Sequence, residues 1–181
     1  MTAPTRPRAR FTLARPTRSA LRTAHVVLGI GWTGLALVML ALPVALLTGG
    51  SGAHAAFVLD VMGVVGGGLI PFFAVGTVLT GVVAGLGTPW GVFRYRWVVA
   101  KTVLALAVIV SSVAVSTRLL DGAQAVAGQD AALLGWLAGV SLAHQVALVA
   151  STLLSVEKPG GRLTGRSGGP AGSGARPDRP R

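Results

Sequence analysis

Four long apolar blocks, almost free of charged residues, constrain this chain more than any other feature of its sequence. They cover about residues 25–48, 55–86, 92–120 and 131–156. Each block is long enough to cross the apolar core of a bilayer as a helix, which takes roughly 20 residues. Only 12% of the residues are charged, about half of what a soluble domain carries. The pattern predicts an all-α, four-helix transmembrane bundle at residues 23–157.

The second block is longer than one crossing requires and too short for two. Two crossings and a turn would need more than roughly 40 residues, so we predict one tilted helix that is distorted at Pro71, because proline has no backbone N–H. In the third block, Thr88 suits a helix cap and Pro89 the first helical position. The first block is too long for the apolar region of a cleaved signal peptide, so we interpret it as a span.

Positive charge is distributed very unevenly around these spans. When four spans alternate, all of the 16 lysines and arginines except Arg118 fall on one side. The positive-inside rule then places both termini in the cytoplasm, as disordered basic tails at residues 1–22 and 158–181. The tails can attract anionic lipid headgroups. They lack the interleaved aromatics that stack on bases, so nucleic acid is not an expected partner. A second copy of the chain or another membrane protein stays open as a partner.

The stretch "GTPWGVFRYRWVVAK" places cations and aromatics at the mouth of the third span. On one helix, Lys101 would share a face with Trp97 and lie about 6 Å deeper. Lys101 either snorkels to the interface or holds an anionic group inside the bundle. Tryptophan, tyrosine and arginine are typical of the membrane interface. The sequence therefore predicts interfacial anchors at Trp90, Arg94, Tyr95, Arg96 and Trp97.

Two charged residues lie on the side of the bundle opposite the termini, one near the start of the second span and one near the end of the third. Asp60 is the only acid inside a predicted span, and Arg118 is the only cation on its side of the bundle. An uncompensated charge at that depth costs several kcal/mol, so we predict a structural ion pair between them. The alternative is a proton or ion relay that also uses His144, as in a small transporter.

Two histidines could carry chemistry. His25 lies about 5 Å beyond Arg22 along a helix, at a depth similar to that of Lys101, and shares a face with Trp32. It is either a haem or metal ligand or a polar anchor. His144 is too deep to bind one metal ion together with His25, and a hydrogen bond across helices is its preferred interpretation.

Other chemistries are excluded by what the sequence lacks. There is no cysteine, so disulfides and thiolate metal sites are absent. No metal-binding histidine pair, carboxylate cluster, hydrolase motif or nucleotide-binding motif is present, so no metal site is expected. Small residues at fourfold spacing predict close helix packing instead. These are Gly63–Gly67, Thr77–Gly81–Gly85 and Gly135–Gly139.

Three segments resemble an uncharacterised bacterial family of predicted four-span integral membrane proteins. The segments are "HVVLGIGWTG", "VLTGVVAGLGTPWGVFRYRWVVAK" and "LSVEKPGGR", within about residues 22–162. The resemblance implies a multi-pass protein of the bacterial plasma membrane, and the glycine-, alanine- and arginine-rich composition looks actinobacterial. The family has no established activity to carry over.

The chain is also distantly similar to the copper-resistance D and membrane protoporphyrinogen oxidase families. The shared residues are a histidine followed by tryptophan and glycine in the first span, a Thr-Gly pair, and a lysine entering a later span. In the oxidase family the histidine and lysine matter for haem binding and activity, which implies haem-binding roles for His25 and Lys101. The arginine- and tyrosine-rich stretch of the oxidases is missing, and methionine and histidine are sparse for copper transport. The corresponding residues are His25, Trp32, Gly34, Thr80, Gly81 and Lys101.

Taken together, the residues favour a non-enzymatic membrane bundle or subunit with no cofactor. The alternative is a membrane redox protein that binds haem b or a porphyrin through His25 and Lys101. The third hypothesis for its function is the small transporter described above.

Overall fold

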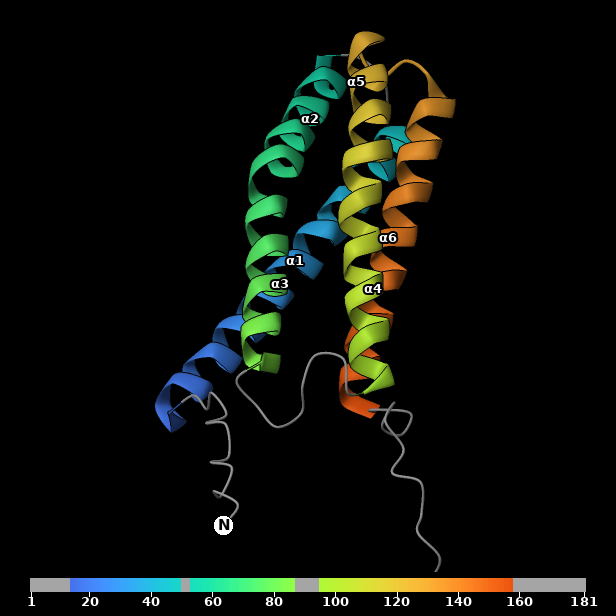
Figure 1. Ribbon diagram of the computed structural model, residues 1–181. Helices are drawn as coiled ribbons and strands as arrows, with labels where there is room; N and C mark the ends of the chain where they lie inside the picture. The colour runs from blue at the N-terminus through green and yellow to red at the C-terminus, as the bar shows by residue number, and fades with distance from the viewer. Residues whose placement is uncertain (1–13, 50–52, 87–94, 158–181) are drawn as a thin grey trace, which may run out of the picture.

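The computed structural model describes residues 14–49, 53–86 and 95–157, and almost all of them are helical (Figure 1). Two short π-helical turns, η1 and η2, lie within longer helices, and the helix continues on both sides of each turn. Consequently α2, η1 and α3 form one continuous helix, and α4, η2 and α5 form another. The elements are α1 (Arg15–Gly49), α2 (Ala53–Val64), η1 (Val65–Leu69), α3 (Ile70–Leu86), α4 (Arg96–Ser111), η2 (Ser112–Ser116), α5 (Thr117–Ala125) and α6 (Ala131–Glu157).

The protein is an all-α four-helix bundle, as the sequence predicts. Within the described residues, four helices are long and apolar enough to cross a membrane. Large apolar side chains cover the outside of the bundle, and Phe57, Val64 and Phe72 are each about two-thirds exposed or more. A soluble protein rarely exposes apolar surface on this scale, whereas lipid is its natural solvent. The chain is therefore a multi-pass membrane protein.

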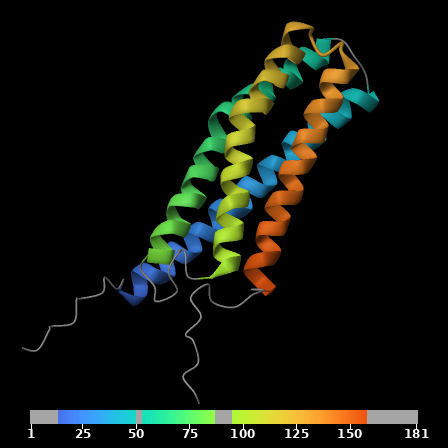
Figure 2. The same ribbon diagram turned by 45° about the vertical axis from the view of Figure 1, so that its right-hand side comes forward.

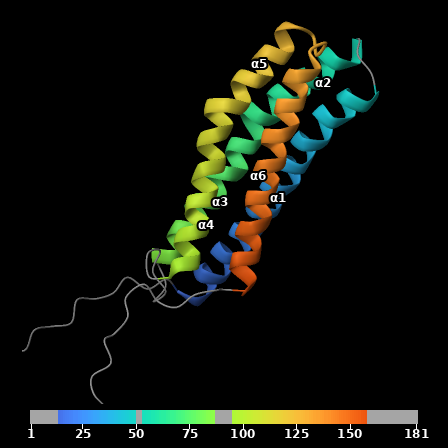
Figure 3. The same cartoon turned by 90° about the vertical axis from the view of Figure 1, so that its right-hand side faces the viewer.

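Helix α1 crosses behind the other helices at a steep angle (Figures 1 and 2). It packs against both α3 and α6, while α4 packs against α6 and α2 packs against α5. The beginning of α1 and the ends of α3 and α6 gather at one end of the bundle, which we call the terminal end (Figure 3). The opposite end, where residues 126–130 connect α5 to α6, is called the loop end.

Two clusters of buried side chains form the core. One lies toward the loop end and joins α2, α5 and α6. The other lies in the middle of the bundle and joins α1, α3, α4 and α6. The first consists of Leu59, Met62, Leu120, Ala123, Leu134 and Leu137. The second consists of Trp32, Ala36, Ala74, Val108 and Leu148.

Helix boundaries depart from the sequence prediction at three places. Helix α1 begins at Arg15, inside the predicted tail, because Pro16 suits a first turn. Helix α4 begins at Arg96 rather than near residue 92, because Tyr95 is extended, with φ −124° and ψ 133°. Helix α5 runs to Ala125, through part of the predicted loop, because this segment is amphipathic and buries its apolar face. The predicted cap Thr88 and first-turn Pro89 lie outside the described residues.

The distortion predicted at Pro71 takes the form of the π turn η1. Pro71 has no N–H to donate, and its ring crowds the preceding turn. The chain responds by widening that turn, so that the N–H of Ile70 bonds the carbonyl of Val65, five residues earlier. A second π turn, η2, lies on the facing helix and contains no proline. Such turns occur often at functional sites.

A tight turn at the loop end is built on two residues with positive φ. Ala127 has a φ of 48° and Gly128 a φ of 70°. The N–H of Gly128 bonds the carbonyl of Ala123 at 2.8 Å, which closes the last turn of α5 in a Schellman-type arrangement. Helix α6 then starts on Asp130, whose Oδ1 accepts from the backbone N–H of Ala132 at 2.8 Å.

Glycines bring α1 and α3 into close contact. The Cβ position of Gly31 falls on the ring of Phe73, and that of Gly76 lies 3.1 Å from Cδ1 of Leu28. Of the predicted Thr77–Gly81–Gly85 series, Gly81 mediates packing, because its Cβ position lies 3.0 Å from the ring of His25. Of the predicted Gly63–Gly67 pair, Gly63 faces Gln124 at 3.4 Å, whereas Gly67 faces no described residue within 4 Å. The prediction for Gly135–Gly139 is wrong. Both residues are exposed on the outside of α6, and no atom lies within 4 Å of either Cβ position.

Candidate functional site

His25 is fixed between α1 and α3 near the terminal end. Its Nδ1 lies 2.9 Å from the carbonyl oxygen of Thr77 and 3.2 Å from Oγ1 of Thr80. Gly81 allows His25 to come this close to α3, because any side chain at position 81 would overlap the imidazole. The structure therefore brings His25 and the Thr80–Gly81 pair of the sequence pattern together, although they are more than fifty residues apart.

The hydrogen bonds of His25 determine which ring nitrogen carries the hydrogen. A carbonyl oxygen only accepts, so Nδ1 must donate to Thr77. The hydroxyl of Thr80 donates to the carbonyl of Gly76 at 2.7 Å, so its oxygen also acts as an acceptor toward His25. Neutral His25 then keeps its lone pair on Nε2, which has no hydrogen-bond partner among residues 14–49, 53–86 and 95–157. This is the arrangement typical of metal-ligating histidines.

Lys101 is half-buried in α4 and is held by α6. Its Nζ donates to Oγ of Ser155 at 2.8 Å, and Ser155 donates in turn to the carbonyl of Ser151. Within the described part of the chain, no carboxylate pairs with Lys101. An ammonium has three hydrogens to donate, so Lys101 can still bind an anionic group.

His25 and Lys101 lie on different helix pairs at the terminal end. His25 is bound to α3 and Lys101 to α6, and the two side chains are not hydrogen-bonded to each other. Trp32, which shares a helical face with His25 in the sequence, is instead buried in the mid-bundle core.

The predicted interfacial anchors are only partly described. Trp90 and Arg94 lie outside the described residues, whereas Arg96 and Trp97 lie in α4. Arg96 is exposed, and the rings of Tyr95 and Trp97 lie 6.4 Å apart at the start of α4. Their place at a membrane interface stays a prediction.

The structure does not bring Asp60 and Arg118 together. Both are exposed, and the residues it describes include no ion pair between them. Gln124 of α5 is the side chain that faces α2, and its Nε2 lies 3.2 Å from the carbonyl of Leu59 and 3.5 Å from Oδ1 of Asp60. Arg118 precedes Gln124 by six residues, which turns it about 120° away around the helix. The predicted ion pair is therefore replaced by an amide contact.

His144 makes the cross-helix hydrogen bond that the sequence predicts. Its Nε2 lies 2.8 Å from Oγ of Ser111 in α4. Ser111 donates its own hydrogen to the carbonyl of Ala107 at 2.7 Å, so the serine oxygen accepts from His144.

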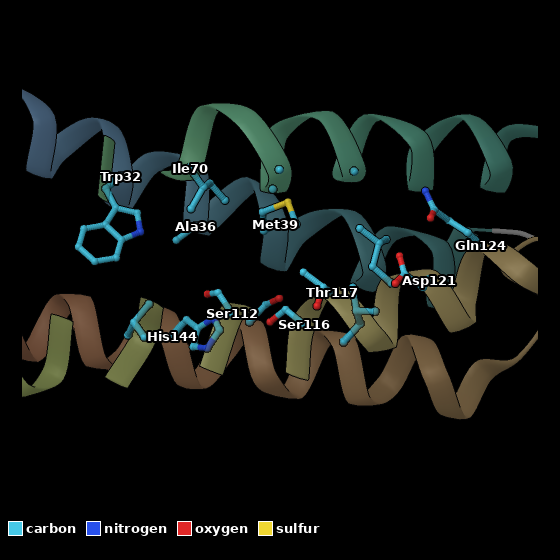
Figure 4. Close-up of a pocket in the computed structure, with 17 residues that line it drawn as sticks. Trp32, Ala36, Met39, Ile70, Ser112, Ser116, Thr117, Asp121, Gln124 and His144 are labelled. Atoms are coloured by element: carbon cyan, nitrogen blue, oxygen red, sulfur yellow. The ribbon is translucent and has the colours of Figure 1, made fainter. Parts of the chain in front are cut away.

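A cavity of about 200 Å³ lies inside the bundle between the two π turns. Figure 4 shows Trp32 and His144 at one end and Asp121 and Gln124 at the other. Helices α1 and α3 and the turn η1 contribute only apolar side chains and glycine, whereas all polar lining residues come from η2, α5 and α6, which also contribute Leu120 and Leu137. The polar lining residues are Ser112, Ser116, Thr117, Asp121, Gln124, Ser141 and His144.

Sequence reasoning missed most of this cavity. It singled out His144 but gave no role to Asp121, the serines of η2 or Ser141. One signal was available, because Ser112, Ser116 and Asp121 follow one another at nearly fourfold spacing at the end of the third apolar block. The signal was weak, because serine and threonine also satisfy their own helix backbone in membranes.

Comparisons of the chain with protein-family models, with curated proteins and with solved structures gave no match. Function must therefore be argued from the geometry.

Proposed function

We propose that this protein is a non-enzymatic bundle of the bacterial plasma membrane that binds an anionic, membrane-soluble ligand at its terminal end. The observation that carries the proposal is the pair formed by His25 and Lys101. Among the described residues, an imidazole whose Nε2 has no hydrogen-bond partner and an ammonium without a carboxylate partner lie at the same end of the bundle. A ligand that offers both a Lewis-acidic centre and a carboxylate would satisfy both groups.

Haem b is the candidate that fits these two groups best. The hydrogen bond from Nδ1 of His25 to Thr77 orients the ring as metal-ligating histidines are oriented. When bound, haem would supply electron-transfer or ligand-binding chemistry through its iron. In this chain, His25 would ligate the iron through Nε2 and Lys101 would hold a carboxylate. The resemblance of His25, Thr80, Gly81 and Lys101 to the oxidase family points the same way.

The deciding measurement is the absorption spectrum of protein expressed with a haem supply and purified in mild detergent. We expect a Soret band in the wild type and its loss in His25→Ala. Lys101→Met should keep the band but release haem faster, by about tenfold, as for a lost charge-assisted hydrogen bond. His54→Ala is the matched control, because His54 is exposed at the other end of the bundle. A wild type without a Soret band after haem supply excludes the haem proposal.

An anionic lipid headgroup is the other source of the same chemistry. Lys101 and the exposed Arg96 both lie in the first turns of α4, where phosphate would be within reach of long side chains. Copurified phospholipid should then fall in Lys101→Met and stay unchanged in His25→Ala. This pattern distinguishes a lipid from haem, whose binding is lost in His25→Ala.

We propose further that both termini are cytoplasmic. The distribution of the 16 lysines and arginines supports this orientation. The chain has no cysteine, so single cysteines can report on each side. Gln129→Cys, at the exposed loop end, should react with a membrane-impermeant thiol reagent in intact cells, and Ser173→Cys only after lysis. Labelling of Ser173→Cys in intact cells would reverse the orientation.

A further inference from the structure

The cavity between η1 and η2 has the composition of a binding site. Ser141 is 8% exposed, lines the cavity and has no hydrogen-bond partner among the residues that the structure describes. Ser112 and Ser116 line the same wall and also lack side-chain partners in the described ranges. Buried hydroxyls are nearly always hydrogen-bonded. Ser141 is buried and Ser112 and Ser116 are half-buried, so their hydroxyls offer hydrogen-bonding groups to water or to a polar occupant of the cavity.

The backbone contributes a further acceptor on the opposite wall. Pro71 has no backbone N–H, so the carbonyl one turn earlier that would accept a hydrogen bond from it lacks this donor. This carbonyl belongs to Gly66 in the π register or to Gly67 in the α register, and both glycines line the cavity. Irregular backbone at membrane depth is tolerated where it lines a cavity.

The charges and hydrogen-bond acceptors of the lining residues favour a positively charged ligand. Among the described residues that line the cavity, Asp121 has the only carboxyl group, and none is a lysine or arginine. Thr117 donates its hydroxyl hydrogen to the carbonyl of Val113 at 2.7 Å, which leaves its oxygen as an acceptor. Asp60 adds a second carboxylate beside Gln124 at the same end. Acceptors and negative charge therefore gather toward the loop end of the cavity.

The apolar wall argues against a bare metal ion. Met39 and Ile70 lie opposite the polar lining residues, and Leu137 adds an apolar side chain from α6. Carbon atoms cannot replace the hydration shell of an ion. The described residues also contain no cluster of three or more histidine or acidic side chains that could bind a metal. An occupant with one polar end and one apolar body fits both walls, as in most small-molecule sites.

The cavity opens on the side of the bundle. Gly67, Thr117 and Asp121 line it and are also exposed. Gly67 lies near the middle of the helix spanning His54–Leu86, which is at membrane depth. A ligand can therefore enter from the lipid as well as from the loop end, which favours a molecule that partitions into membranes.

From these observations we propose that the cavity binds a small organic ammonium with an apolar body. The ammonium lies at Asp121 and donates to the hydroxyl oxygens of Ser116 and Thr117. The apolar body lies against Met39 and Ile70. This site is separate from His25 and Lys101 at the terminal end, so either proposal can fail without the other.

Benzylammonium and benzyl alcohol form a matched pair of probes, because they differ mainly in charge. Binding to the purified protein in mild detergent can be followed by saturation-transfer NMR and titration calorimetry. We expect saturable binding of benzylammonium that is about threefold to tenfold tighter than that of benzyl alcohol, because the charge of Asp121 is partly screened. Equal binding of the two probes, or no saturable binding of either, overturns the proposal and leaves a cavity filled by water or lipid.

Two variants locate the site. Asp121→Asn should weaken benzylammonium binding by about threefold to tenfold, a modest effect because Asp121 is exposed and its charge is screened. Ser141→Leu should abolish binding of both probes by filling the cavity. Glu157→Gln is the control for Asp121→Asn, since it removes an exposed acid at the other end of the bundle. Unchanged affinity in Asp121→Asn contradicts the site even if Ser141→Leu does not fold.

Discussion

Replacing Gly31 by alanine is expected to destabilise the protein by about 1–3 kcal/mol, the usual cost of forced overpacking. The added Cβ would lie 2.6 Å from Cδ1 of Phe73 and 3.2 Å from Cζ. An aromatic ring cannot bend, so Phe73 must change rotamer or α3 must move away from α1. The free energy of unfolding in mixed micelles of mild detergent and SDS would measure the loss.

Gly34→Ala is the matched control for this change. It lies on the same helix, and nothing lies within 4 Å of its Cβ position. Alanine is the better helix former, so this variant should be as stable as the wild type or slightly more stable. Adding Phe73→Leu to Gly31→Ala should restore part of the loss, because the shorter side chain can make room. Similar losses at Gly31 and Gly34 would mean that the contact with Phe73 is unimportant.

The second large effect is expected at the loop end, where Gly128→Ala should cost about 2–4 kcal/mol. An alanine at a φ of 70° is strained by about 1–2 kcal/mol. Its Cβ would also lie 3.0 Å from Cβ of Ala55, which is almost completely buried, and 3.3 Å from Cδ1 of Leu59. The two costs add, since neither relieves the other. The same unfolding measurement applies.

Ala127→Gly tests whether strain alone explains such a loss. Ala127 already has a φ of 48° and is exposed. Glycine removes that strain while making the unfolded chain more flexible, so the variant should change stability little. A Gly128→Ala variant as stable as the wild type would show that the packing of the turn on α2 is looser than the structure indicates.

The candidate sites were predictable to different degrees. His25, Thr80, Gly81 and Lys101 form a sequence pattern, and the structure places the first three in contact. Ser155, the partner of Lys101, could not be predicted. Nothing in the sequence distinguishes it from the other serines of α6. The Asp60–Arg118 pairing was predicted from depth alone. A prediction from depth does not consider the position of a residue around the helix axis. Arg118 lies on a different side of its helix from Gln124, the residue that faces α2.

The sequence by itself determines the four spans of this protein, because backbone groups in lipid must be satisfied within each helix and apolar length is a local property. It also contains Pro71, which requires a break in regular bonding wherever the helix packs. Only the tertiary structure decides which polar side chains meet, since this depends on the crossing and rotation of helices that are distant in the chain. The steep α1 brings His25 to Thr77, and the facing π turns create the cavity in which Ser141 lacks a partner.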